Sequence, residues 1–554
     1  MHQLLRCLLP VALLAMALPI HAQTKKQKKA QAAANAATEA NLRRHIAVLA
    51  SDSLEGRRTG TAGEEKAVQY LEACYRQLGI GGLQSDGSFR QPFTVDEGKV
   101  PAEQMRCAVN DQPLQWGTDY VALPWSAEKA IEDIAAVALQ EQGAPWWYDL
   151  AEDLEANKNN PHLVPEQLIR DKAKDAAAKG ATALLVFNSS KTDDGIKYNG
   201  KDRSDATAIP VLFFTKAAQQ RLRIDDRAEF KMKFQVAFRQ QTRSGTNVAA
   251  LIDNKAAFSI VLGAHLDHLG YGEDGNSRHT GAGEIHNGAD DNASGTAALL
   301  ELARLLKAKS LPFNIALLHF SGEELGLYGS KYFVEHPLLD LKKVNYMINL
   351  DMVGRLNDSS RALTIGGIGT SPAWPSLLQL DAQKDFTIKI DSSGTGPSDH
   401  TSFYRKDLPV LFFFTGLHTD YHKPSDDASL INYKGTVSIV NYITSLIERT
   451  NPQDKLAFTK TREQSMGGGR FKVSIGIMPD YTFSGQGVKA DGVIEGRPAQ
   501  KAGVQAGDVI IQLGDHLITS VDTYMQALNR FEKGQQTVVT IKRGKDVKEF
   551  PITF

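Results

Sequence analysis

The sequence has little cysteine and no excess of charge of either sign. Only three of its 554 residues are cysteines, Cys7, Cys74 and Cys107, which is too few for a disulfide framework or for a metal cluster held by paired thiolates. Any bound metal ion must therefore take nitrogen and oxygen ligands. Lysine and arginine total 63 against 64 aspartate and glutamate, a net charge of -1. No basic excess therefore indicates a nucleic acid or an anionic membrane surface as a partner.

Long apolar runs are also missing. The first apolar stretch, residues 8–18, is shorter than the roughly 20 residues that cross a membrane as a helix, and no later stretch of that length is free of charges and turn residues. Arg6, this stretch and the small residue Ala22 have the order of a secretory signal peptide. We therefore expect a signal peptide at residues 1–22, a periplasmic or secreted protein, and no transmembrane segment. Whether the two remaining cysteines are bonded stays open.

The rest of the composition is that of a globular protein with several domains. Hydrophobic residues make up 42% and charged residues 23% of the chain, which predicts a sizeable core. Residues 23–40 are rich in lysine, glutamine and alanine, and we expect them to form a flexible tether. Residues 42–80 have the apolar spacing of helices, interrupted at 52–63 by a turn-rich segment with three glycines.

Two kinds of β pattern follow. From about residue 91 to 239, short β-like runs such as 183–187 and 211–215 predict an inserted β-rich domain. From residue 249, apolar runs alternate with helical segments, which predicts an α/β domain with a doubly wound, mostly parallel sheet. These later runs are residues 259–262, 314–320, 344–350 and 408–415.

The patterns define the expected domain boundaries. The α/β domain takes residues 41–108 and 242–450, and the insertion takes 109–241. A polar segment with three consecutive glycines, residues 451–470, is expected to be a linker. Residues 471–554 then form a separate module of short strands.

Histidines and acidic residues lie just past the ends of the apolar runs. His265 and Asp267 follow the first run, Glu323 and Glu324 the second, Asp351 the third and His422 the fourth. In a doubly wound sheet the carboxyl ends of the strands line the crevice where ligands bind. Four strand ends therefore converge on one predicted site. This convergence outweighs the alternative of unrelated core histidines and surface acids.

The spacing within this set favours a metal centre. His265 and Asp267 are two residues apart, so an extended backbone puts both side chains on one face. Asp267 could then orient the imidazole through its second ring nitrogen. Asp290 and Asp291 precede a helical run that begins near Gly295. An acidic pair there could serve as a helix cap, but beside a strand-end histidine it also offers a bridging carboxylate for two metal ions.

The adjacent pair Glu323 and Glu324 suits two different roles. Neighbouring side chains diverge, so one can ligate a metal ion while the other acts as general base on water. Two divalent ions would bring four positive charges against three from ligating carboxylates, which leaves room for one bridging hydroxide. Because two metal ions lower the pKa of water and polarise a carbonyl group, amide hydrolysis is the predicted chemistry.

At these residues the sequence resembles the M28 family of zinc exopeptidases, whose motifs are His-x-Asp, Gly-Ala-Asp-Asp, Glu-Glu, Asn-Leu-Asp and a late histidine. The segment at 51–63 is similar to that family as well. The resemblance implies the zinc exopeptidase fold and two Zn²⁺ ions, for which Co²⁺ or Mn²⁺ could substitute. The implied ligands are His265, Asp291 and Asp351 for one ion and Asp291, Glu324 and His422 for the other. Glu323 would be the general base, and Asp267 would orient His265.

The other two modules have resemblances of their own. The insertion resembles a protease-associated (PA) domain through residues 178–181, 183–187 and 209–211. The C-terminal module resembles a PDZ domain, with residues 474–477 similar to a carboxylate-binding loop and 497–508 similar to the core of that fold. Such domains bind an extended peptide or a C-terminus by adding a strand to a sheet edge. A purely stabilising role is the alternative for both modules.

These features together imply an exported two-zinc aminopeptidase that removes N-terminal residues from peptides by means of a metal-bridging hydroxide and a glutamate base. A dipeptidase or carboxypeptidase on the same fold is the nearest alternative, because pocket loops set that choice. A protein of another class, an inactive peptidase fold that binds peptides through the PDZ-like module, would have lost ligands, and here all of them are present. The expected partners are peptides, with no nucleic acid.

Overall fold

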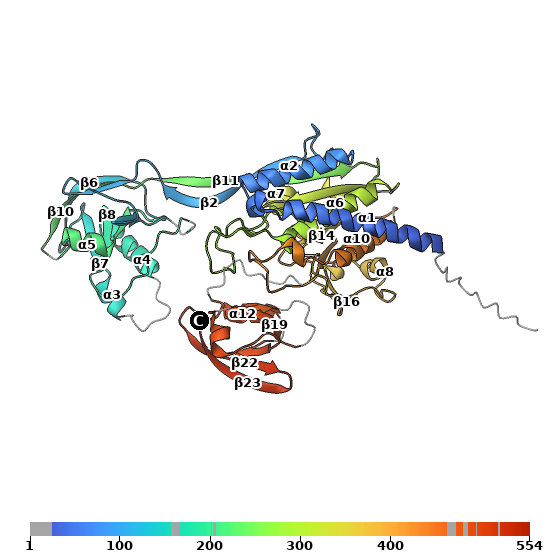
Figure 1. The fold of residues 1–554 in the computed structure, drawn as a ribbon. Helices are drawn as coiled ribbons and strands as arrows, with labels where there is room; N and C mark the ends of the chain where they lie inside the picture. Colours follow the sequence, from blue (N-terminus) through green and yellow to red (C-terminus); the bar gives the residue numbers. More distant parts are fainter. Residues whose placement is uncertain are drawn as a thin grey trace, which may run out of the picture.

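The computed structural model describes residues 25–156, 165–200, 202, 206–225, 227–451, 453–461, 473–479, 486–494, 496–518 and 521–554. Figure 1 shows an α/β domain, a β-rich module at the far end of a two-stranded ribbon, and a C-terminal module. The predicted signal peptide lies outside the described residues. Within the described ranges, no helix has the length and apolar character needed to cross a membrane.

The α/β domain is built on a nine-stranded mixed sheet in the order β1-β11-β13-β12-β14-β17-β15-β16, with β2 paired to β11. Its strands are β1 (Gly81–Gly82), β2 (Arg90–Pro101), β11 (Phe238–Ile252), β12 (Ser259–His265), β13 (Asn314–Phe320), β14 (Val344–Leu350), β15 (Ala362–Gly366), β16 (Thr387–Ile390) and β17 (Val410–Phe414). The central strands β13, β12, β14 and β17 are parallel, whereas β11 and β15 join them antiparallel. The prediction of parallel strands is confirmed for the centre of the sheet, and the edges make the whole sheet mixed.

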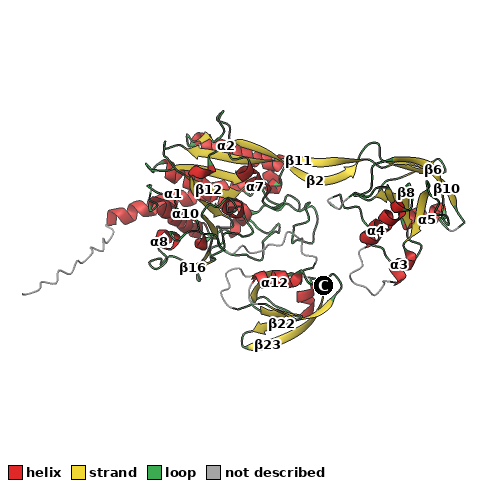
Figure 2. Ribbon diagram, turned by 180° about the vertical axis from the view of Figure 1, so that it is seen from behind, coloured by secondary structure: helices red, strands yellow, loops and turns green. Residues whose placement is uncertain are grey.

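Helices cover both faces of this sheet (Figure 2). They are α1 (Lys25–Leu49), α2 (Ala62–Gln77), α6 (Gly295–Lys307), α7 (Tyr328–Glu335), α8 (Trp374–Leu378), α9 (His400–Tyr404) and α10 (Tyr433–Glu448), with short turns η1 (Asp52–Arg57), η2 (Ala289–Ser294), η3 (Leu341–Lys343), η4 (Ile368–Thr370) and η5 (Ala428–Leu430). Leu71 of α2 and Leu300 of α6 share a core with Ile260 of β12. Phe333 of α7 packs in another core with Val261, the next residue of β12. Because successive strand residues point to opposite faces, β12 is apolar on both sides.

Residues 25–40 correct one prediction. They belong to α1 and are not the flexible tether predicted for 23–40. Alanine, lysine and glutamine are strong helix formers, so the composition that suggested a tether also suits a helix. The helix is held by α6, because Thr38 is buried and its hydroxyl accepts a hydrogen bond from Arg304 Nη2 (3.2 Å).

Strands β2 and β11 leave the main sheet as an antiparallel ribbon that carries the β-rich module (Figures 1 and 2). The module contains β3 (Arg106–Val109), β4 (Gln112–Leu114), β5 (Tyr120–Ala122), β6 (Ala130–Ala136), β7 (Pro145–Asp149), α3 (Ala151–Ala156), α4 (Pro165–Ala178), β8 (Ala183–Phe187), β9 (Val211–Phe214), α5 (Lys216–Leu222) and β10 (Glu229–Gln235). These strands form two sheets, β4-β3-β10-β6 and β5-β9-β8-β7, around a core that includes Trp147 and Phe230. Cys107 of this module and Cys74 of α2 are both free thiols.

The C-terminal module has a sheet and a core of its own. It contains β18 (Ile477–Pro479), β19 (Val488–Val493), α11 (Pro498–Ala502), β20 (Val509–Leu513), β21 (His516–Leu517), α12 (Val521–Leu528), β22 (Gln536–Arg543) and β23 (Asp546–Thr553). The strand order is β18-β19-β20-β22-β23, with β21 paired to β20. Ile475, Ile510 and Val539 are completely buried in its core, so this module has the means to fold as a separate unit.

Part of the predicted linker packs on the α/β domain. The described residues 453–461 lie within it, and the ring of Phe458 lies 5.6 Å from that of Tyr404. The hydroxyl of Tyr404 donates a hydrogen bond to the carbonyl of Thr461 (3.1 Å). This segment is therefore an extension of the α/β domain and not a free spacer, which corrects the prediction for the first half of the linker.

Candidate metal centre

Four parallel strands bring the predicted residues to one edge of the main sheet. β12 ends at His265, and Asp351 follows β14 directly. Glu323 and Glu324 lie in the loop between β13 and α7, and His422 lies in the loop between β17 and η5. Because these strands run in the same direction, their carboxyl ends meet. The predicted convergence of four strand ends is thus observed.

A first group of ligand atoms comes from three buried residues, His265, Asp291 and Asp351. Nε2 of His265 lies 3.3 Å from Oδ1 of Asp291 and 3.3 Å from Oδ1 of Asp351, and the three ligand atoms lie within 4.8 Å of one another. The hydroxyl of Ser398 donates to Oδ2 of Asp351 (2.8 Å) and so fixes that carboxylate. The sequence did not assign Ser398 a role.

A second group consists of His268, Asp291 and Glu324, and the predicted ligand His422 lies against both of its carboxylates. Nε2 of His422 lies 3.3 Å from Oδ2 of Asp291 and 3.2 Å from Oε2 of Glu324. His268 also has a ring nitrogen in this group, because its Nδ1 lies 2.9 Å from Oε1 of Glu324. Sequence reasoning missed His268. The available signal was its place directly after His-x-Asp, where the chain turns past the end of β12.

The structure shows why Asp291, and not Asp290, faces both groups. Oδ1 of Asp290 accepts a hydrogen bond from the backbone N–H of Gly354 (2.6 Å). The carboxylate of Asp426 accepts hydrogen bonds from the backbone N–H groups of Asp290 (2.9 Å) and Asp291 (3.0 Å). Gly288 begins this turn with a φ of 55°, a left-handed conformation that glycine adopts at little cost. The loop is therefore fixed with the Asp291 carboxylate directed to the centre.

A buried arginine holds the loops beneath the centre. The side chain of Arg57 donates hydrogen bonds to the carbonyls of Leu266 (2.9 Å), Asn287 (2.7 Å) and Gly288 (3.0 Å). Burial lowers the pKa of Arg57 to about 10, against the opposing charge of Asp291, so the guanidinium stays charged at neutral pH. Arg57 lies in the turn-rich segment at 52–63, whose role the sequence left open.

Asp267 makes a different contact from the one predicted. Nδ1 of His265 lies 3.1 Å from the backbone carbonyl of Asp267, whereas the nearer carboxylate oxygen is 3.7 Å away. The carboxylate accepts hydrogen bonds from the hydroxyl of Thr59 (2.9 Å) and from the backbone N–H of Glu323 (3.2 Å). Asp267 thus supports His265 through its main chain and positions the Glu323 loop through its side chain.

The carboxylates of the centre have very different proton affinities. Burial raises the pKa of Glu323 well above its usual range, and the charges of Asp351 and Glu324 add to this effect. Burial also acts on Asp291, but hydrogen bonds with histidines outweigh it and hold the pKa of Asp291 well below its usual range. Despite burial, the charge of His422 brings the pKa of Glu324 to about 2. Burial also raises the pKa of Asp351, but Glu323, whose pKa is raised well above its usual range, is the acid of this set that most readily carries a proton.

The donor set fits divalent cations. Four buried or largely buried carboxylates lie against one another here, and buried like charges without compensation are strongly unfavourable. Imidazole nitrogens and carboxylate oxygens in tight groups are ligands that first-row metal ions prefer. The Asp291 carboxylate belongs to both groups. It could therefore ligate one cation in each group.

The loop between β12 and η2 connects the second group to the rest of the domain through hydrogen bonds. Nδ1 of His422 donates to the carbonyl of Asn276 (2.9 Å), whose side-chain amide donates to the carbonyl of Glu324 (3.2 Å). Two residues earlier, Asp274 accepts from Nη2 of Arg243 (2.7 Å) on β11. The loop therefore connects two candidate ligands to the base of the ribbon.

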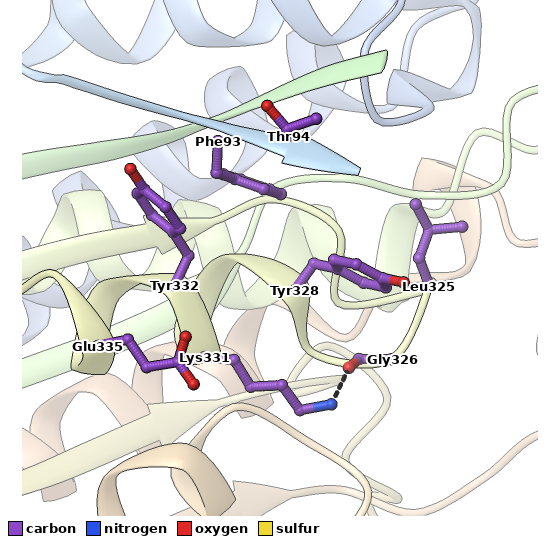
Figure 3. Close-up of a pocket in the computed structure, with 8 residues that line it drawn as sticks. All are labelled: Phe93, Thr94, Leu325, Gly326, Tyr328, Lys331, Tyr332 and Glu335. Atoms are coloured by element: carbon purple, nitrogen blue, oxygen red, sulfur yellow. Dashed lines mark hydrogen bonds between the residues drawn. The ribbon is translucent and has the colours of Figure 1, made fainter. Parts of the chain in front are cut away.

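A cavity of about 490 Å³ lies beside the Glu323–Glu324 loop, between β2 and α7 (Figure 3). It is lined by Phe93, Thr94, Leu325, Gly326, Tyr328, Lys331, Tyr332 and Glu335. Nζ of Lys331 donates to the carbonyl of Gly326 (2.5 Å) at one end. The candidate ligands are not among the lining residues, so the cavity adjoins the metal centre without being part of it.

Comparison with known families agrees with this geometry. The model of peptidase family M28 matches residues 247–447, which contain all the candidate ligands. The model of the PDZ domain matches residues 450–554. Residues 247–447 thus match an M28 peptidase domain, and residues 450–554 match a PDZ domain.

Two of the curated relatives are named as aminopeptidases. The chain is 26% identical over 295 residues to the aminopeptidase YwaD of Bacillus subtilis, covering 51% of this chain and 60% of that protein. It is 32% identical over 261 residues to an aminopeptidase of Pseudomonas aeruginosa, covering 44% of this chain and 45% of that one. The chain thus spans about half the length of the curated relatives that it matches. A solved zinc aminopeptidase from Bacillus subtilis, BSAP, is 20% identical with a TM-score of 0.41, over 76% of this chain and 98% of that one.

Proposed function

We propose that this protein is a two-zinc aminopeptidase that removes residues from the N-terminus of peptides. The observation that carries the proposal is the pair of ligand groups joined by Asp291 at the carboxyl edge of the sheet. One group would hold a zinc ion through His265 and Asp351, and the other through Glu324 and His422. His268 faces the same carboxylate of Glu324, so it is either a further ligand or its support.

The residues around this pair suit amide hydrolysis. Bound zinc would lower the pKa of water and polarise the scissile carbonyl. Glu323 lies beside the ligand groups, and its backbone is held by Asp267. Its carboxylate would take a proton from the attacking water and return it to the leaving amine. Burial raises the pKa of Glu323, and the positive charge of bound zinc would oppose this rise, so that the carboxylate could be ionised before it accepts the proton.

The choice of an aminopeptidase is supported by the two relatives from Bacillus subtilis and Pseudomonas aeruginosa, both of which are named aminopeptidases. A dipeptidase or carboxypeptidase on the same fold is the alternative that the sequence left open. The signal-peptide pattern at residues 1–22 supports export, to the periplasm or the medium. The resemblance of the ribbon-borne module to a PA domain supports a role in restricting access to the centre.

The experiment is hydrolysis of Leu-Gly-Gly, its N-acetyl derivative and its C-terminal amide, with zinc and after chelation. We expect zinc-dependent release of leucine that requires the free amino group and is still detected with the C-terminal amide. Cleavage of the acetylated peptide that requires a free carboxylate would select the carboxypeptidase alternative. A protein that binds zinc and cleaves none of the three peptides would contradict the proposal.

A second function, peptide binding by the PDZ domain, is favoured by the position of β18. This strand lies at the edge of the described C-terminal sheet, next to Gly476, which has a φ of 82°. An edge strand can accept an extended peptide as a further strand. Titration of the full chain with a hydrophobic C-terminal peptide and with its amide should show binding that requires the free carboxylate.

A further inference from the structure

An arginine beside the metal centre lies at the end of a stack of three side chains. Cζ of Arg278 is 4.5 Å from the centroid of the Tyr421 ring. The Tyr421 ring in turn stacks on the ring of His422, with 3.9 Å between centroids and 29° between planes. The backbone N–H of Arg278 also donates to the carbonyl of His422 (2.9 Å). Arg278 thus contacts the candidate ligand His422 directly through its main chain and indirectly, through the Tyr421 ring, by its side chain.

The other arginines near the centre have charged partners or a full set of acceptors: Arg57 donates to backbone carbonyls through all three guanidinium nitrogens. Arg58 and Arg243 both bind Asp274, and Arg355 binds Asp420. Among the residues that the structure describes, Arg278 has no carboxylate partner, and its Nη1 is buried without a hydrogen-bond acceptor. A buried donor without a partner is costly. The position therefore holds a cation that has no carboxylate partner and has one donor without an acceptor.

We propose that Arg278 binds the α-carboxylate of a short peptide substrate, so that dipeptides and tripeptides are preferred. The inference rests on the proposed aminopeptidase function. Cζ of Arg278 is 4.5 Å from the centroid of Tyr421, and that centroid is 3.9 Å from the centroid of His422. The guanidinium carbon is therefore no farther from the His422 ring than the sum of these two distances. An extended peptide advances about 3.3–3.6 Å per residue. This distance from His422 corresponds to about two extended residues, the length of chain that a dipeptide or tripeptide would need to bring its α-carboxylate to Arg278.

The chemistry of the side chain selects the ligand. A guanidinium is always charged and offers parallel N–H donors that match both oxygens of a carboxylate. A short peptide brings its terminal carboxylate to this position, whereas a long peptide brings an uncharged amide. An acidic side chain after the cleaved bond would offer the same group, so the test must separate these two sources.

The test compares kcat/KM for Leu-Gly and Leu-Gly-amide, and for Leu-Glu-amide and Leu-Gln-amide, in zinc-loaded full-length protein. We expect Leu-Gly to exceed its amide at least tenfold, and Leu-Glu-amide to equal Leu-Gln-amide within twofold. In Arg278→Gln the first ratio should fall to about one, and Arg278→Lys should retain part of it. Arg361→Gln is the matched control, because Arg361 also lies over an aromatic ring, 5.3 Å from the centroid of Phe386, but on the β15 side of the sheet.

Each protein is judged by the ratio of kcat/KM for Leu-Gly to that for Leu-Gly-amide. A general loss of activity, caused by a change in the stack of Arg278, Tyr421 and His422, lowers both values and leaves this ratio unchanged. Equal rates for Leu-Gly and its amide in the unmodified protein, or a ratio unchanged in Arg278→Gln, would overturn the inference and leave the aminopeptidase function standing. A preference for Leu-Glu-amide that depends on Arg278 would overturn it in favour of an acidic side chain. Absence of cleavage of all four peptides would overturn the proposed function and this inference together.

Discussion

At the scale of single residues, the acids of the centre differ in proton affinity, and the candidate ligand Asp351 shares with Glu323 a pKa that burial raises. Asp291 and Glu324 are kept ionised by histidines, whereas burial and neighbouring acids raise the pKa of Glu323. Near Glu323, burial also raises the pKa of Asp399 to about 7. A site with acids of such different proton affinity is suited to general acid–base chemistry.

Glu323→Gln tests whether Glu323 is the general base. The amide keeps the size of the side chain but cannot take a proton, so kcat should fall by about 10²–10⁴-fold. Zinc content should be unchanged, because the ligand groups remain. Glu335→Gln, in the adjoining cavity, is the control and should keep activity within twofold. Full activity of Glu323→Gln on Leu-Gly-Gly would show that another residue is the base.

A buried histidine on β13 makes the stability of the peptidase domain depend on pH. His319 is completely buried, and its Nε2 lies 2.7 Å from the hydroxyl of Tyr75. Burial lowers the pKa of His319 to about 3, whereas an unfolded histidine titrates near 6.5. Between these values the unfolded chain binds the extra proton, so this contribution to the free energy of unfolding is full above about pH 6.5 and is lost as pH falls toward 3.

The variant His319→Gln should therefore show a shallower pH dependence. The difference in free energy of unfolding between the unmodified protein and the variant should increase by about 1.4 kcal/mol per pH unit on going from pH 4.5 to 5.5. Urea unfolding at several pH values measures it. A difference that does not change with pH would mean that His319 is not held neutral by the fold.

Single residues could be predicted where their position relative to the apolar runs of the sequence indicates their role. His265, Asp351 and the glutamate pair were found because they follow apolar runs. His268 was missed because its approach to Glu324 depends on a turn after the strand. Arg57 was missed because it donates to backbone carbonyls of distant loops. Every residue has such a carbonyl, so the residue types in those loops do not indicate the contact.

At the scale of elements, strands and turns place the ligands. β13 and β14 coincide with the predicted runs at 314–320 and 344–350, because strands that are buried on both faces need continuous apolar sequence. The first helix was predicted only in part, since its exposed N-terminal turns have no apolar face and look like a tether. Such a segment can be assigned only from its helix propensity and from the contact of Thr38 with α6.

The turn at Gly288 is the element whose change should be most harmful. A Cβ atom there would clash with the carbonyl oxygen of Asp291 and with the ring of His268. Gly288→Ala should therefore displace both residues, and a displacement of about 1 Å can reduce activity by about 10²-fold. Activity on Leu-Gly-Gly and zinc retention during dialysis measure the effect.

Gly283→Ala provides the matched control for this change. Gly283 has a φ of 78° and no atom within 4 Å of a Cβ at that position. It therefore adds the same kind of backbone strain in the preceding loop without the clash. Equal loss of activity in the two variants would assign the effect to backbone strain and would contradict the assigned role of the Gly288 turn.

At the scale of the whole molecule, the peptidase and PDZ domains have separate cores. The peptidase domain extends beyond α10, because residues 453–461 pack on it. A chain truncated after residue 461 should therefore keep the melting temperature of the peptidase domain and its activity on Leu-Gly-Gly. The domain organisation followed from composition and motifs, but this packed extension did not, because its few apolar residues lie in a polar segment.

A chain truncated after residue 450 should be less stable. It loses the partly buried side chains of Leu456 and Phe458 and the hydrogen bond of Thr461, together about 2 kcal/mol. The melting temperature of the peptidase domain should fall by about 4–8 °C, as measured by calorimetry. Identical melting temperatures for the two truncated chains would show that this segment contributes nothing.

The central claim is that Asp291 joins two zinc sites, and its most direct test is the zinc content of the full chain after saturation and removal of free metal. We predict two zinc ions per chain in the unmodified protein and at most one in Asp291→Ala. A single zinc ion in the unmodified protein, or two ions retained with equal affinity in Asp291→Ala, would contradict the claim.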